Sequence, residues 1–130
     1  MALGYSVTTR NGKANAITTA VGSAGVLYIY AGTRPATGGT AGTLLATFTL
    51  GSPFATGAAS GILSPTLPTA VAATAAGTAS WFRVATTAGA AQVIDGDIGT
   101  TGSDLNLSTT TISVGLSISI TSWTITMGNP

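Results

Sequence analysis

The stretch from residue 77 to residue 107 constrains the fold of this chain most, because it combines bulky apolar side chains with charge. It holds four of the seven charged residues in the sequence, together with Trp81 and Phe82. Residues 79–86 alternate as a strand does, with Trp81 and Arg83 on one face and Phe82 on the other. We therefore expect a strand on which the stem of Arg83 packs against the ring of Trp81.

A second strand is expected to return alongside the first, because Gly89 permits the chain to reverse. Residues 92–94 would form this return strand, which brings Arg83 close to Asp95 as a cross-strand ion pair. Such a pair contributes roughly tenths of a kcal/mol if it is exposed and more if it is partly buried. Three glycines that follow predict a loop that turns hard more than once: Gly96, Gly99 and Gly102.

Small side chains dominate the sequence, since 77 of the 130 residues are Ala, Gly, Thr or Ser. Each contributes little apolar area, so we expect a thin monomer core and self-association, most simply as a homotrimer, to complete the burial. Charged residues make up only 5% of the chain and the net charge is +1, which argues against a nucleic-acid partner. A near-neutral surface suits a protein that works inside an assembly.

The absence of histidine and cysteine from the sequence excludes several kinds of chemistry. Nucleophile systems built on Ser–His or Cys–His pairs are not available, and neither are disulfides. Residues 1–5 do not resemble a secretion signal, and proline and glycine interrupt the Ala-rich run at residues 55–79. We therefore expect no membrane partner and a protein that is made and used in soluble form.

Short β-rich segments separated by glycine and proline predict an all-β fold with little helix. Only residues 10–21 have the pattern of a helix, which Gly22 would end. The parity of the apolar residues changes near the end of the chain, which predicts a β-bulge at Thr121 and Ser122. Further strands are expected at residues 26–30, 44–50, 105–107 and 110–114.

The predicted architecture is a single domain that comprises residues 1–130. Residues 1–25 would form an N-terminal arm and one short helix. Residues 26–127 would form a β-sandwich or jelly roll of short antiparallel strands.

The three aspartates are the only acidic groups, and hence the only candidates for metal binding or acid–base chemistry. Asp95, Asp97 and Asp104 lie in the segment DGDIGTTGSD, which faintly resembles an acidic Ca²⁺ loop. The segment lacks the regular alternation and closing Glu of an EF-hand, and aspartate is common in Gly-rich turns. We therefore expect turn-forming aspartates, no metal, no cofactor and no enzymatic activity.

Four residues are candidates for contacts with a partner: Arg10, Lys13, Arg34 and Tyr30. In a chain with so few charges, each cation is a candidate for a specific partner, and a solvated surface charge is the alternative. Trp81 and Trp123 are expected in the core, on strands that face each other. Stacking on a ligand is the alternative for these two rings.

Four segments in a fixed order carry a resemblance to a known family: VLYIYAGTRPATGGTAGTLLATFTL, GTASWFRV, DGDIGTTGSDLNL and ISITSWTITM. Together they resemble a family of small virion proteins of tailed bacteriophages, over residues 11–127 and most weakly over residues 51–74. Proteins of this kind are similar to capsid decoration or cement proteins, which bind the outside of the head at junctions between capsomers, often as trimers. The resemblance implies no catalytic or metal-binding residues.

The function that the resemblance implies is that of a bacteriophage virion structural protein, made in the host cytoplasm and placed on the outer surface of the head. As a decoration or cement protein it would bridge neighbouring subunits of the major capsid protein by burying apolar and small-residue surface. A tail, neck or fibre-associated structural protein is the first alternative. A carbohydrate- or receptor-binding β-sandwich with exposed aromatics is the second, and an Asp-dependent hydrolase is the third.

Overall fold

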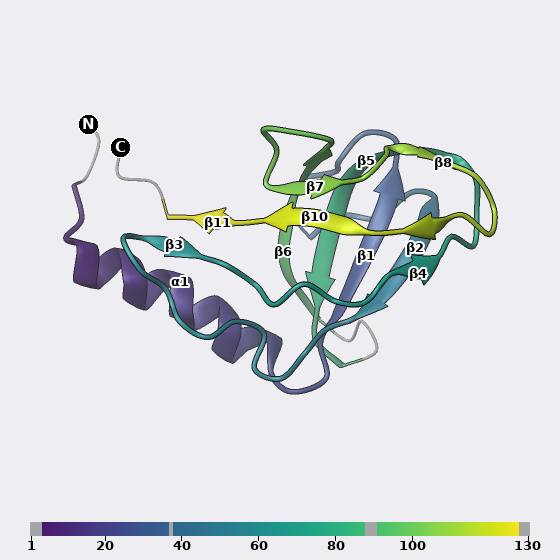
Figure 1. Ribbon diagram of the computed structural model, residues 1–130. Coiled ribbons are helices and arrows are strands. Elements are labelled where there is room, and N and C mark those ends of the chain that lie inside the picture. The colour runs from purple at the N-terminus through teal and green to yellow at the C-terminus, as the bar shows by residue number, and fades with distance from the viewer. Residues whose placement is uncertain (1–3, 37, 88–90, 128–130) are drawn as a thin grey trace.

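The computed structural model describes residues 4–36, 38–87 and 91–127, which form one helix and eleven strands. In chain order the elements are α1 (Val7–Val21), β1 (Val26–Ala31), β2 (Leu44–Thr49), β3 (Ile62–Leu63), β4 (Val71–Ala72), β5 (Gly77–Ala85), β6 (Gln92–Gly99), β7 (Leu105–Leu107), β8 (Thr111–Ile112), β9 (Ser117–Ile118), β10 (Ile120–Trp123) and β11 (Ile125–Thr126). The predicted mostly-β chain with one N-terminal helix is confirmed (Figure 1). Gly89, where the sequence predicts a reversal, lies outside the described residues.

The helix α1 begins three residues earlier than predicted, because Ser6 caps it. The Ser6 hydroxyl accepts a hydrogen bond from the Thr9 backbone N–H at 3.1 Å, which satisfies one of the donors that a first helical turn leaves free. Gly22 ends the helix as predicted, at a φ of 73° that glycine adopts without strain.

Side-chain hydrogen bonds to backbone groups attach α1 to the segment before β3. Asn11 Oδ1 accepts the Gly61 N–H and Asn15 Oδ1 accepts the Ala58 N–H, both at 2.8 Å. These backbone donors belong to a loop and need acceptors outside it. The two asparagines therefore position the helix, which buries few side chains of its own.

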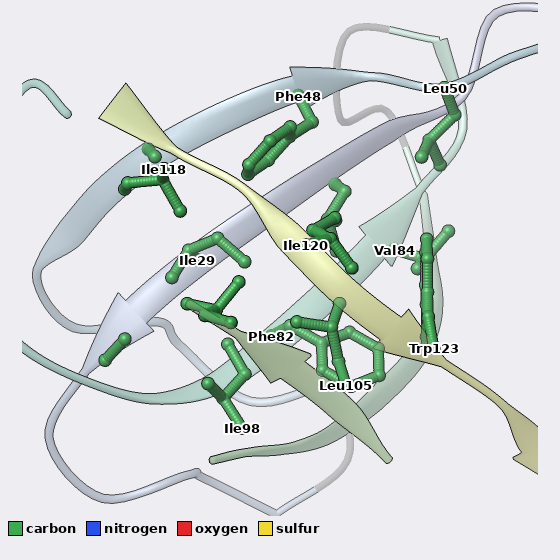
Figure 2. Packing of buried hydrophobic residues seen from close by; sticks show 14 of the residues in the cluster. Ile29, Phe48, Leu50, Phe82, Val84, Ile98, Leu105, Ile118, Ile120 and Trp123 are labelled. Carbon is green, nitrogen blue, oxygen red and sulfur yellow. The ribbon is translucent and has the colours of Figure 1, made fainter. Parts of the chain in front are cut away.

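The main sheet has the order β10-β7-β6-β5-β1-β2, and β8 pairs with the first residues of β5. The long strand β5 is central, since it pairs antiparallel with β1 on one side and with β6 on the other. The sheet curls, so that β10 lies across β1 and β5 with the core between them (Figures 1 and 2). Two short pairs complete the described fold, β3 with β11 and β4 with β9.

The expectation of purely antiparallel strands is wrong at one place, because β6 and β7 run parallel. The register places Ile98 beside Leu105. Parallel neighbours usually need a long crossover connection, but this pairing is so short that residues 100–104 suffice to loop back beside the strand they leave. Gly102 takes a φ of 71° within that loop. The sheet is therefore mixed.

The main core fills the space between the inner face of the sheet and β10 (Figure 2). The Trp123 ring makes edge contacts with Phe54 at 5.3 Å and with Phe82 at 5.6 Å between ring centroids. Ile29 and Phe48 enter from β1 and β2, and both are fully buried. Large side chains therefore fill this core although small residues dominate the composition.

Two of the glycines predicted to form a loop belong instead to β6, which continues as far as Gly99. A Cβ added at Gly96 would lie 2.5 Å from the Phe82 ring, and one added at Gly99 would lie 2.5 Å from Ser103 Oγ. Of the three glycines, only Gly102 turns the chain with a positive φ. The prediction fails because a glycine that makes room for a neighbouring side chain has the same sequence signature as a turn.

The predicted β-bulge is confirmed where β10 pairs with β7. The register shifts between Ile120, which lies opposite Leu107, and Ser122, which lies opposite Asn106. The extra residue changes the side to which the following side chains point. As a result, Trp123 is buried in the core like Ile120.

Opposite effects are expected for two glycine-to-alanine substitutions. Gly96→Ala should lower the free energy of unfolding by about 1–3 kcal/mol, because its methyl group overlaps the Phe82 ring. Gly12→Ala should raise it by about 0.5–1 kcal/mol, because Gly12 lies in α1 with nothing within 4 Å of the added Cβ. Urea unfolding of both variants measures the changes, and equal midpoints would contradict the packing described for Gly96.

Candidate functional site

Charged and aromatic residues gather on the outer face of the sheet, opposite the main core. The register places Tyr30 beside Trp81 and Arg83 beside Asp95. Tyr30 and Trp81 stack with ring centroids 4.4 Å apart, and the Arg83 guanidinium lies 5.3 Å from the centroid of Trp81. The expected packing of Arg83 on Trp81 is confirmed, and these four residues are called the outer cluster.

The ion pair of Arg83 and Asp95 is bidentate and almost fully buried. Arg83 Nε donates to Asp95 Oδ1 at 2.8 Å, and Nη2 donates to Oδ2 at 3.0 Å. The two side chains are 13% and 2% exposed. The predicted cross-strand pair is therefore confirmed, in the buried form in which loss of one partner leaves an unpaired charge.

The pKa values of both partners move in the directions that a stable ion pair requires. The hydrogen bonds to Asp95 raise the pKa of Arg83 above its usual range. Burial by itself raises the pKa of Asp95, but hydrogen bonds from Arg83 and from the Gly38 N–H outweigh burial, so the pKa of Asp95 lies below its usual value. Burial also raises the pKa of the Tyr30 hydroxyl.

The described residues between β1 and β2, 32–36 and 38–43, are called the cover loop because hydrogen bonds attach them to the outer cluster. Arg83 Nη2 donates a further hydrogen bond to the Gly39 carbonyl at 2.8 Å. The Gly38 N–H donates to Asp95 Oδ2 at 3.4 Å, from a backbone with a φ of 79°. The cover loop therefore completes the hydrogen bonds that a buried ion pair needs.

A second ion pair lies at the rim of the outer cluster. Arg34 Nε is 3.5 Å from Asp97 Oδ1, and the two side chains are 42% and 62% exposed. Solvent screens such a pair, so it contributes less than about 1 kcal/mol. Arg34 Nη1 also donates to the Asp95 backbone carbonyl at 3.3 Å. The structure thus places this candidate interface residue as a tie between the cover loop and β6.

The other candidate interface residues also have contacts within the chain. Arg10 Nε donates to the Met127 carbonyl at 2.9 Å, which joins α1 to the segment after β11. Lys13 Nζ lies 4.0 Å from the centroid of the Tyr5 ring. Tyr30 is 9% exposed and offers little surface to a partner. The partner contacts of these residues stay predictions.

The three aspartates do not form a common site. Asp95 is bound by Arg83. Asp97 faces Arg34, and its backbone N–H donates to Asp104 Oδ2 at 3.2 Å. Within the described ranges, no three side chains of the Asp, Glu, His or Cys type are placed to hold a metal ion. Chemically, the described carboxylates accept hydrogen bonds and hold strands together.

Both tryptophans are buried as predicted, but they lie on opposite sides of β5. Trp81 is 1% exposed in the outer cluster, and Trp123 is 3% exposed in the main core. A single core was expected to hold both, but the side chains of β5 alternate and Phe82 takes the inner side. Neither ring presents a face to solvent on which a sugar or a base stacks.

A small pocket of about 140 Å³ opens between β6 and β11, next to the outer cluster. It is lined by residues 94–96 of β6, by residues 124–127 around β11, and by Phe82 and Asp104. The sequence predicted neither this pocket nor the glycine contacts of the cover loop. The reason is that both are formed by segments that meet only in the tertiary structure.

Comparison with known proteins found no relative: no family model matches the chain, and no curated protein and no solved structure matches it. In the part of the chain that the structure describes, no helix is both long enough and apolar enough to cross a membrane.

Breaking the buried ion pair should destabilise the protein. Arg83→Ala should lower the free energy of unfolding by about 1–3 kcal/mol, because it leaves the Asp95 carboxylate buried without its partner. A double-mutant cycle with Asp95→Ala, measured by urea unfolding, should give a coupling energy of similar size. The matched control is the cycle of Arg34→Ala with Asp97→Ala, whose exposed pair should couple by less than about 1 kcal/mol. Equal coupling in the two cycles would contradict the burial of the first pair.

Acid should destabilise the protein through Asp95. Because its pKa is lower in the folded protein than in the unfolded chain, the ion pair contributes its full stability above the ordinary aspartate value of about 3.9. That contribution is lost as the pH falls through the lower, folded pKa. Thermal midpoints should therefore decline steeply below about pH 4, and Asp95→Asn should weaken this decline. Asp97→Asn, which changes an exposed carboxylate, is the control. If both variants change the decline equally, the acid sensitivity does not come from Asp95.

Proposed function

We propose that this chain is a bacteriophage virion structural protein, most simply a decoration or cement protein on the outer surface of the head. The observation that carries the proposal is that four of the seven charged residues pair with one another within the chain. Two Arg–Asp pairs hold the cover loop and β6 in place, which leaves a largely neutral surface of small side chains. Such a surface suits close packing within an ordered assembly and is poorly suited to recognition of a charged ligand.

Contacts with neighbouring subunits of the major capsid protein would use the exposed apolar side chains. The large ones are between 40% and 69% exposed and lie on separate parts of the chain: Val7, Ile62, Leu67 and Val114. Burial contributes about 25 cal/mol per Å² of apolar surface, so one such contact is weak. Many copies on one shell act together, and rupture of the shell then has to break all of these contacts.

The proposal includes a homotrimer and a sandwich-type architecture. The small-residue composition and low net charge support self-association, as does the resemblance of the ordered segments to trimeric decoration proteins. The position of β10 across β1 and β5 supports a second layer of the kind found in sandwiches and jelly rolls (Figure 1). The receptor-binding alternative receives less support, because Tyr30 and Trp81 are buried in their stack.

Particles of the phage that encodes this chain test the proposal. A place on the head predicts a copy number of the same order as that of the major capsid protein, whereas a tail, neck or fibre protein is present in few copies. Purified protein should bind heads that lack it and raise the temperature at which those heads rupture. Heads that already carry all of their copies of the protein are the control, and they should bind no more of it. Confinement to the tail, or failure to bind depleted heads, would contradict the proposal. Sedimentation as a monomer would contradict the trimer.

A further inference from the structure

The pocket between β6 and β11 has features of a binding site that the proposed function does not use. We propose that it receives the side chain of a lysine or arginine carried on an extended segment of a partner protein. One wall is formed by residues 94–96 and the other by residues 124–127. The inference goes beyond a role in the virion, because it depends only on the groups that these two walls present.

The size and lining of the pocket suit one long side chain. Its volume of about 140 Å³ is close to that of a cavity that holds a benzene-sized ligand, and is below the roughly 300 Å³ at which pockets for drug-sized ligands and cofactors begin. The partly exposed Ile94 and Met127 offer carbon surface to the aliphatic stem of a lysine or arginine, and the buried Phe82 and Ile125 lie behind them. A nucleotide exceeds these dimensions.

Asp104 supplies the charge that selects a cation. It lines the pocket, it is exposed, and among the described residues no cation lies within ion-pair distance of it. Asp95 lines the pocket as well, but Arg83 already binds both of its carboxylate oxygens. Asp104 Oδ2 accepts the Asp97 N–H at 3.2 Å, which holds the carboxylate beside β6 and leaves its other oxygen for an ammonium or guanidinium group.

The open edge of β6 indicates that the side chain comes from an extended segment. β7 pairs only with Ile98 and Gly99, so the half of β6 that lines the pocket has β5 on one side and no described strand on the other. The bond from the Asp97 N–H to Asp104 shows that Asp97 points to this open side. The backbone groups of Asp95 point the same way, because they alternate along a strand. The exposed Arg34 side chain donates to the Asp95 carbonyl there at 3.3 Å, and an incoming segment would take the place of this contact. A segment that pairs with this edge brings alternate side chains towards the pocket.

The opposite wall turns a second set of backbone groups towards the pocket. The Met127 N–H donates to the Gly61 carbonyl at 2.8 Å, so Ile125 and Met127 direct their backbone groups towards β3. Thr126 lies between them, lines the pocket, and directs its N–H and C=O away from β3. Two strand edges thus border one small space, an arrangement that favours strand addition over a free small molecule.

Titration with a lysine peptide tests the site without any change to the protein. Millimolar acetyl-Thr-Lys-Thr-amide, followed by NMR on isotope-labelled protein, should shift the amide resonances of Asp95, Gly96 and Thr126 most. The same peptide with an acetylated lysine side chain should bind about tenfold more weakly, because it lacks the charge that pairs with Asp104. Absence of shifts at Gly96 and Thr126, or equal binding of the two peptides, overturns the proposal.

Matched carboxylate variants separate a specific contact from general attraction. Asp104→Asn should weaken binding of the lysine peptide by about tenfold. Asp97→Asn removes the same charge from a residue that does not line the pocket, and it should change the affinity for the peptide by less than about twofold. Equal losses would indicate diffuse attraction and overturn the proposal. Sedimentation of the protein and of Asp104→Asn is measured as well. If the protein does not bind the peptide but self-associates, and Asp104→Asn abolishes the self-association, the pocket binds a second copy of the chain. That result overturns the proposal of an extended partner segment.

Discussion

The buried ion pair of Arg83 and Asp95 is the contact on which the outer side of the fold depends. Arg83 belongs to β5 and Asp95 to β6, and both bind the cover loop, through Gly39 and Gly38. Removing two charges from water costs several kcal/mol for each ion unless hydrogen bonds replace the lost hydration. The cover loop supplies these bonds, and for that reason the ion pair determines where the loop lies.

Coverage of β5 on both faces explains how a chain of small residues achieves enough burial. Phe82 and Val84 face the main core, while Trp81 faces the outer cluster, and all three are at most 1% exposed. A strand covered on both sides buries nearly all of its large side chains. A few aromatic residues then provide much of the buried apolar area, while small residues allow the layers to approach closely.

The placement of charge connects this fold with its proposed roles. Four of the seven charged residues form two pairs within the chain, and Arg10 binds backbone carbonyls. Lys13 and Asp104 are exposed, and neither forms an ion pair with another described residue. In the proposed roles, a protein with this surface would attach to its neighbours by apolar contacts and by single charges at defined places, as an assembly of many copies requires.

Sequence by itself determined the features that follow from local periodicity. Alternation with a period of two identified β1, β5 and the pairing of Arg83 with Asp95, and a change of parity located the bulge in β10. Tertiary structure alone decided that β6 continues through Gly96, where Phe82 needs the space, and that residues 100–104 fold back to make β7 parallel. The cover-loop contacts and the pocket were also decided by the tertiary structure alone. Each forms where distant segments meet, and the pattern of a segment records its own burial and not the identity of the neighbour that buries it.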